Sequence, residues 1–128
     1  MQKKILIVDN DIAVCVLVSA IVKKLGYESV SATDGYEAIK MLEKYNSISL
    51  VITDINMPMM NGLVLLEEIW RHFSHLKVIV MTSDITEELL PLKNRVLGIV
   101  DKFDLFHSLT GILDRPIKDL SASVDSTT

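Results

Sequence analysis

The chain has 128 residues, enough to bury one hydrophobic core and short for two domains. Hydrophobic residues make up 49% and charged residues 23%, a balance typical of a globular fold and not of disorder or a coiled coil. The formal net charge of -4 provides no basic surface for nucleic acid or an anionic membrane, so we expect neither as a direct partner.

The cysteine content and the apolar runs near the N-terminus indicate in which compartment the protein is found. The single cysteine, Cys15, excludes an internal disulfide, and its apolar surroundings predict a small core residue. The apolar run before Asp9 is too short for a signal-peptide core. The run from Ile12 to Val22 is well below the roughly 20 residues that span a bilayer. We therefore expect a cytoplasmic protein.

Short apolar runs predict the strands. Four of them are continuous, the pattern of parallel strands covered on both faces, and a fifth candidate alternates as an edge strand does. The continuous runs are ILIV (5–8), LVI (50–52), VIVM (78–81) and LGIV (97–100), and the alternating one is ESVSAT (28–33).

Capping residues predict helices between these strands. Gly26 closes the first helix, and Pro91 predicts a short or broken helix within 85–94 because it removes a helical hydrogen bond. The four regular helices are expected at 12–25 after Asp11, 36–45 after Asp34, 63–73 after Asn61 and Gly62, and 105–113 after Asp104. Strand and helix alternate, which predicts an α/β fold: a doubly wound five-stranded parallel sheet with helices on both faces.

Polar residues follow the apolar runs where a ligand would bind in such a sheet. Carboxylates gathered there would repel each other by roughly 4 kcal/mol at about 4 Å and an effective dielectric near 20, so a cation is expected. Mg²⁺ suits one or two carboxylates and leaves room for phosphate oxygens, which indicates phosphoryl transfer. The strand-end residues are Asp9, Asn10, Asp11, Asp54, Thr82, Ser83, Asp101 and Lys102.

The stretch TDINMPMMNG (53–62) resembles the phosphoacceptor loop of response-regulator receiver domains. VDND at the first strand end, Thr82 and Ser83 at the fourth and Lys102 after the fifth extend this resemblance over residues 1 to about 114. It implies the flavodoxin-like strand order 2-1-3-4-5. We expect a receiver domain at 1–114 and a polar tail or the start of a linker at 115–128. A receiver that starts at Met1 suits a standalone protein or the N-terminal part of a longer regulator.

The resemblance also implies roles for individual residues. Asp54 resembles the aspartate that accepts a phosphoryl group from a histidine kinase or phosphotransfer protein, with Thr82 as the switch hydroxyl and Lys102 as its ammonium partner. The implied magnesium ligands are Asp9, Asn10, Asp54 and Asn56, the last through its backbone carbonyl. A downstream output domain or protein is the implied recipient of the signal, and a homodimer stays open.

Three departures from the family pattern bear on this expectation. Asn10 stands where the direct carboxylate ligand is usual, which could cost a few kcal/mol of Mg²⁺ affinity, so weak binding is expected. Phe103 replaces the usual proline after Lys102, so the usual cis peptide is not expected there. Ile99 replaces the usual aromatic residue, and the stretch from Thr82 to Lys102 is short.

Two alternatives therefore remain. A degenerate receiver would bind a partner without phosphorylation. A haloacid-dehalogenase-type phosphatase would use Asp9, since that family begins with Asp-x-Asp, but it needs further acids and only 26 residues follow Lys102. His72 and His75 have a spacing that a metal could use, although an exposed helical face explains them better.

Overall fold

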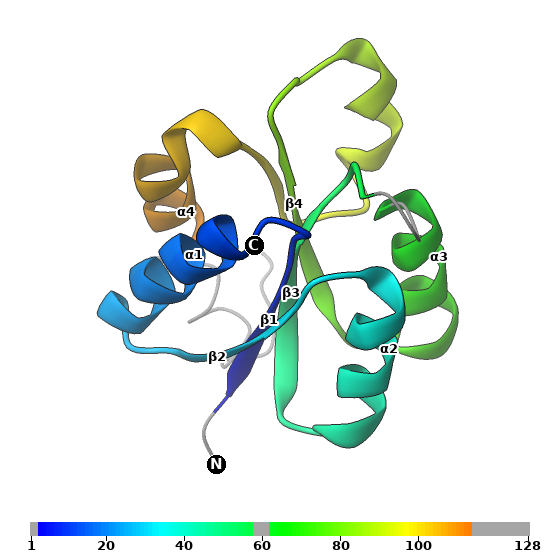
Figure 1. Ribbon diagram of the computed structural model, residues 1–128. Coiled ribbons are helices and arrows are strands. Elements are labelled where there is room, and N and C mark those ends of the chain that lie inside the picture. Colours follow the sequence, from blue (N-terminus) through cyan, green and yellow to red (C-terminus); the bar gives the residue numbers. More distant parts are fainter. Residues whose placement is uncertain (1–2, 58–61, 114–128) are drawn as a thin grey trace, which may run out of the picture.

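The computed structural model describes residues 3–57 and 62–113, which form a five-stranded parallel sheet (Figure 1). The strand order is β2-β1-β3-β4-β5, as the family resemblance implied. The strands are β1 (Lys4–Val8), β2 (Glu28–Ala32), β3 (Ile48–Asp54), β4 (Lys77–Thr82) and β5 (Gly98–Asp101). All five predicted strands are present, and ESVSA lies at the edge as expected.

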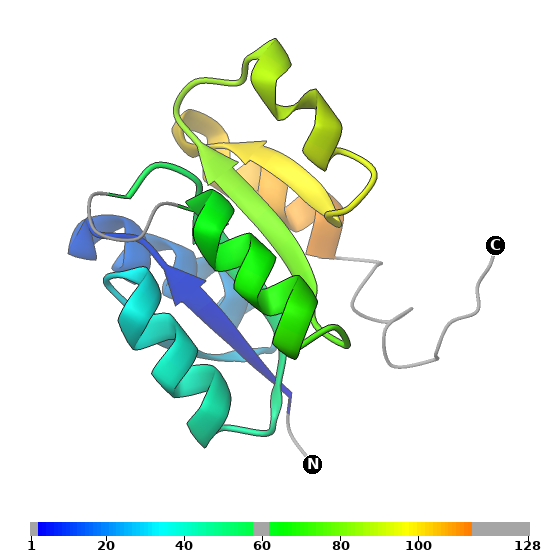
Figure 2. The same ribbon diagram turned by 90° about the vertical axis from the view of Figure 1, so that its right-hand side faces the viewer.

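Helices cover both faces of the sheet. In Figure 1, α1 and α4 lie to the left of the sheet, whereas α2, α3 and the 3-10 helix η1 lie to its right. Figure 2, turned by 90°, shows α2 and α3 in front of the strands. The helices are α1 (Ile12–Lys24), α2 (Gly35–Lys44), α3 (Gly62–His72), η1 (Glu87–Leu92), η2 (Lys102–Asp104) and α4 (Leu105–Leu113).

Two apolar clusters explain why the strand sequences are continuously hydrophobic. Ile5 and Ile7 of β1 pack with α1 and α4, and the alternating residues Leu6 and Val8 pack with α2 and α3. All four side chains are buried. Since both faces of the central strands are covered by helices, no position along them can be polar without a partner.

Helix ends follow the capping signals at the first two helices. The Asp11 carboxylate accepts a hydrogen bond from the Ala13 N–H, and the Asp34 carboxylate accepts one from the Glu37 N–H. Gly26 follows α1 with φ 98°, a conformation that favours glycine. These three end signals are therefore confirmed.

Other details differ from the prediction or lie outside it. Asp104 was predicted to cap α4, but it is the last residue of the short helix η2. The cap of η2 is Asp101, whose carboxylate accepts a hydrogen bond from the Phe103 N–H. The Asp104 carboxylate contacts the His107 ring at 3.1 Å. The predicted break at Pro91 is confirmed, since only the six-residue η1 connects β4 to β5. Asn61 and the tail 115–128 lie outside the described residues.

Two further observations concern the peptide bond after Lys102 and the membrane. Every peptide bond in the described residues is trans, including the one that joins Lys102 to Phe103. Within those same residues, no helix is long and apolar enough to cross a membrane.

Candidate functional site

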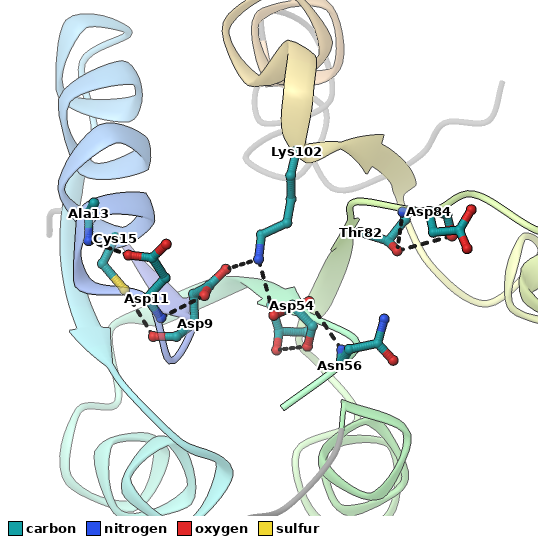
Figure 3. A network of polar contacts seen from close by, with 10 residues as sticks. Asp9, Asp11, Ala13, Cys15, Asp54, Asn56, Thr82, Asp84 and Lys102 are labelled. Atoms are coloured by element: carbon teal, nitrogen blue, oxygen red, sulfur yellow. Dashed lines mark hydrogen bonds and ion pairs between the residues drawn. The ribbon is translucent and has the colours of Figure 1, made fainter. Parts of the chain in front are cut away.

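The ends of three strands bring two carboxylates and one ammonium group together (Figure 3). Val8 is in register with Thr53, so Asp9 lies beside Asp54 at the carboxyl edge of the sheet. Lys102 follows β5 and reaches back between them. Its Nζ lies 2.7 Å from Asp9 Oδ2 and 3.1 Å from Asp54 Oδ2. The predicted convergence of these three residues is confirmed.

The three charges are largely removed from solvent. Asp9 is 0% exposed, Asp54 is 4% exposed, and the Lys102 side chain keeps 18% of its surface. Burial by itself lowers the pKa of Lys102, but its close contacts with the Asp9 and Asp54 carboxylates and their negative charge outweigh this and raise that pKa above its ordinary value. Lys102 therefore stays charged and offsets one of the two acids.

Each aspartate is oriented by the backbone two residues further along. Asp9 Oδ1 accepts the Asp11 N–H at 2.8 Å, and Asp54 Oδ1 accepts the Asn56 N–H at 3.1 Å. These bonds leave both Oδ2 atoms on the Lys102 side. Lys102 donates a hydrogen bond to Asp54 Oδ2. Its contact with Asp9 is an ion pair by distance only, because the buried Asp9 Oδ2 has no well-directed hydrogen bond among the described residues.

The donor set fits a magnesium ion, although with fewer charged ligands than a full acidic pair would supply. The buried Asp9 Oδ2 lacks a directed donor, and Asp54 adds a second carboxylate, which matches the one or two acids that Mg²⁺ uses beside water. Asn10 is exposed and adds no charge. No cluster of three or more His, Cys, Asp or Glu side chains suited to a metal occurs in residues 3–57 and 62–113.

Thr82 lies at the same edge but makes other contacts. Its buried hydroxyl donates to the Asp84 carbonyl at 3.2 Å and accepts the Asp84 N–H at 3.1 Å. Figure 3 shows this pair turned away from Asp54. The site as it stands therefore joins Asp9, Asp54 and Lys102, while Thr82 is held by the loop that follows β4.

Two supporting residues were not predicted to act here. The Cys15 Sγ donates to the Asp9 carbonyl at 3.4 Å, and burial together with the Asp9 charge raises the pKa of its thiol. Gly62 begins α3 so close to β3 that an added Cβ would lie 2.5 Å from Ile55 Cα and 2.7 Å from the Asp54 carbonyl oxygen. The apolar sequence of α1 gives no sign that Cys15 contacts Asp9, whereas the sequence pair Asn61-Gly62 does indicate a tight turn at the start of α3.

His72 and His75 do not form a site. The His72 Nε2 faces Glu68 at 3.7 Å within α3, and both histidines are exposed. Their predicted exposure is confirmed, but the predicted shared helical face is wrong, because α3 ends at His72 and His75 lies in the turn that follows.

Sequence comparison identifies the family of this chain. A family model described as the response regulator receiver domain matches residues 5–102. The chain belongs to this family. Because the match is to the receiver domain, the haloacid-dehalogenase alternative loses its support.

Curated relatives of this receiver are two-component regulators from bacteria and plants. The Regulator of RpoS from Escherichia coli K12 is 33% identical over 93% of this chain and 32% of its own length. The CpxR homolog of Haemophilus influenzae is 36% identical over 77% of this chain and 40% of its length. The putative two-component response regulator ARR21 of Arabidopsis thaliana is 32% identical, and the match covers 77% of this chain and 16% of that protein. The receiver thus spans less than half the length of these relatives.

Solved structures agree on the fold. The signal receiver domain of an HD domain-containing protein from Pseudomonas fluorescens has a TM-score of 0.86 at 21% identity, covering 96% of this chain and 100% of that one. TrrA from Thermotoga maritima has a TM-score of 0.72 at 30% identity, covering 88% and 100%. The first likeness supports the fold alone. This chain therefore contains a response-regulator receiver domain of two-component signalling, with the fold of other receivers.

Proposed function

We propose that this receiver accepts a phosphoryl group on Asp54 from a phosphohistidine of a histidine kinase or phosphotransfer protein. The contact that carries this proposal is the one between Lys102 and Asp54, at 3.1 Å. It fixes one oxygen of a nearly buried carboxylate while the Asn56 N–H fixes the other. A carboxylate held from two sides presents its oxygens in a defined direction, and positioning supplies most of the catalysis in phosphoryl transfer.

The chemical step forms one bond and breaks one. An Asp54 carboxylate oxygen bonds to phosphorus, the P–N bond to the donor histidine breaks, and the imidazole keeps that electron pair. Lys102 balances negative charge on the transferred phosphoryl group, and the Thr82 hydroxyl exchanges its bonds with Asp84 for one to a phosphoryl oxygen. In this way the product would differ from the resting site in the loop that follows β4.

Magnesium belongs to the same proposal. Asp9, Asp54 and the Asn56 backbone carbonyl would hold the ion, with Asn10 beside it, and Mg²⁺ would neutralise charge on the phosphoryl oxygens. The TrrA relative was solved in complex with Mg²⁺-BeF, which supports this assignment. Weak affinity is expected because Asn10 brings no charge and Lys102 already contacts Asp9 Oδ2.

The setting of the domain completes the proposal. We assign the receiver to residues 1–114, with 115–128 as a tail or linker toward an output domain or protein. A cytoplasmic location fits a kinase partner, and a homodimer stays open.

Labelling with a small phosphodonor and Mg²⁺ tests the phosphoacceptor. The intact mass of the wild type should increase by one phosphoryl group, and Asp54→Asn should not change because its amide is a poor nucleophile. Asp84→Asn is the matched control, since it removes an exposed carboxylate next to Thr82 and should still be labelled. Equal labelling of Asp54→Asn and wild type would overturn the proposal.

A degenerate receiver is the second candidate, and one observation favours it. The Lys102 ammonium lies within ion-pair distance of both acids, so the chain itself supplies them with a counter-ion. This candidate predicts no phosphate uptake at millimolar Mg²⁺ and unchanged partner affinity in Asp54→Asn. Labelling of the wild type alone would eliminate it.

A further inference from the structure

The outward side of α1 is apolar, whereas the outward sides of α2 and α3 carry charge. α1 has no charged residue before Lys23. Ile12 keeps 67% of its surface exposed, Val16 64% and Leu17 49%, although surface helices normally place polar residues outward. The exposed apolar residues, here called the α1 face, are Ile12, Ala13, Val16, Leu17 and Ala20. The exposed charged residues of the other two helices are Lys40, Glu43 and Lys44 in α2 and Glu67 and Arg71 in α3.

Contacts with the sheet determine which side of α1 points outward. Val18 and Val22 are buried in the apolar cluster beneath the helix, and the Ser19 hydroxyl is hydrogen-bonded to that of Ser29 on β2 at 3.0 Å. The α1 face lies on the other side of the helix, and no element of the described part of the chain covers it. Figure 1 shows α4 beside α1 on the same side of the sheet, and α4 adds the half-exposed Phe106.

The two ends of α1 carry opposite charges. The exposed Asp11 precedes the helix, and the exposed Lys23 and Lys24 end it. Neither lysine forms an ion pair within residues 3–57 and 62–113. Asp11 and Lys23 are about 18 Å apart along the helix axis, at 1.5 Å per residue. An antiparallel copy of α1 would therefore bring the lysines of each chain to Asp11 of the other, whereas a parallel copy would bring like charges together.

We propose that a second copy of this chain covers the α1 face, with the two α1 helices antiparallel about a two-fold axis near Val16 and Leu17. Such an axis places Val16 of one copy against Leu17 of the other. Ala13 then lies opposite Ala20, where small side chains let the helices approach. Both copies contribute the same face, as a two-fold contact requires. Apolar burial provides the affinity, and the exposed ion pairs, which contribute little energy, select the antiparallel direction.

Sedimentation equilibrium of the full chain tests the association. Because one helix from each copy makes a small interface, we expect a dissociation constant of about 10 μM. The average mass should rise from that of one chain to that of two between about 1 and 300 μM, a range that brackets this constant.

Two leucine variants distinguish the α1 face from other exposed apolar residues. Leu17→Glu should raise the dissociation constant about tenfold or more, because each copy would bury an unpaired charge. Leu63→Glu is the matched control on α3, on the other side of the sheet, and should leave the dimer unchanged. Both leucines are 49% exposed, so neither substitution should unfold the domain.

Charge reversal tests the contact between helix ends. Lys23→Glu with Lys24→Glu should weaken the dimer, since acids would then meet Asp11 of the other copy. About 0.5 M NaCl should partly restore it by screening this repulsion. Lys40→Glu with Lys44→Glu, at exposed positions of α2, changes the net charge equally and should have no such effect.

Paramagnetic labelling tests the antiparallel direction. A nitroxide is attached to Lys24→Cys in ¹⁴N protein, where the native Cys15 is buried, and this protein is mixed with ¹⁵N wild type. The amide signals of Ile12 and Ala13 in the ¹⁵N chain should lose more intensity than that of Val22, because the end of one α1 lies beside the start of the other.

Three results would overturn the proposal. The first is the mass of one chain over the whole concentration range, which would leave the α1 face to a different protein. The second is an equal effect of Leu17→Glu and Leu63→Glu on the dimer. The third is a greater loss of intensity at Val22 than at Ile12 in the mixture. None of these variants alters Asp54, so the results are independent of the phosphodonor experiment.

Discussion

Lys102 is the residue on which the charge balance of the site depends. Its ammonium lies between acids from β1 and β3 that would otherwise face each other in a nearly buried site. Removing one member of a buried charged group costs more than the group contributes as a whole, because the remaining charge keeps its desolvation penalty. The same position is where a magnesium ion would be attracted.

Lys102→Met should therefore lower the free energy of unfolding by about 3 kcal/mol in EDTA, since both carboxylates lose the ammonium that contacts them in the described part of the chain. Adding Mg²⁺ should recover part of this loss because a dication can replace the ammonium beside the same oxygens. Urea denaturation with and without Mg²⁺ measures both effects. Lys40→Met, at an exposed position of α2, is the control and should change little. An unchanged stability of Lys102→Met in EDTA would contradict the ion-pair account.

Asn10→Asp tests whether position 10 lies at the metal. We expect Mg²⁺ to bind about tenfold more tightly, roughly 1.4 kcal/mol, which is below the Coulomb value for close charges because residue 10 is exposed. Phosphodonor labelling should also become faster. Calorimetric titration with Mg²⁺ and the labelling rate provide the measurements, and Asn46→Asp, between α2 and β3, is the matched control. If neither quantity changes, Asn10 has no part in metal binding.

At the scale of elements, the distance between α3 and β3 determines how the loop after Asp54 is held. The Gly62 N–H donates to the Ile55 carbonyl at 2.9 Å, and no space remains for a side chain. Any residue larger than glycine must push α3 away from the strand that carries Asp54. Ile55 and Asn56, which directly follow β3, would then be displaced.

Gly62→Ala should lower the free energy of unfolding by about 2 kcal/mol, because its methyl group would clash with backbone atoms of Ile55 that cannot rotate away. Thermal denaturation provides the measurement. Gly111→Ala is a matched control in α4, where an added Cβ meets nothing within 4 Å, and it should stabilise the protein by about 1 kcal/mol. Equal effects of the two substitutions would show that helix propensity, and not close approach, decides both.

For the whole molecule, the contacts of Lys102 connect three strands at one edge of the sheet. Asp9 follows β1, Asp54 ends β3 and Lys102 follows β5. The two ion pairs of Lys102 therefore connect the ends of these three strands, in addition to the backbone hydrogen bonds of the sheet. The stability of the fold should therefore depend on the charge of this one lysine. Because its pKa is raised in the folded state, the direction of that dependence follows directly.

The contribution of Lys102 should be fully present below its ordinary pKa of 10.5 and lost as the pH rises through the higher folded value. The difference in unfolding free energy between wild type and Lys102→Met should thus be constant near neutral pH and shrink in alkaline solution. Denaturation curves from pH 7 upward, compared pairwise, cancel the titration of the other groups. A difference that grows with pH would contradict the raised pKa.

Much of the fold follows from local sequence. Continuous apolar runs predict buried parallel strands because both faces of such a sheet are covered, and Asp11, Asp34 and Gly26 mark helix ends through contacts within a few residues. Pro91 predicts the short connection before β5 for the same local reason. The ordered strand ends also predict which polar residues meet. These features depend on backbone geometry that each segment carries with it.

Only the tertiary structure decided how the meeting residues divide their contacts. Lys102 and Asp54 are 48 positions apart, and the sequence does not reveal that one ammonium would reach two acids, or that the Thr82 hydroxyl would be bonded to Asp84. The clearance at Gly62 and the exposed apolar side of α1 are likewise set by how helices pack on the sheet. Such distances result from the packing of the whole chain, whereas propensity and periodicity act over a few neighbouring residues.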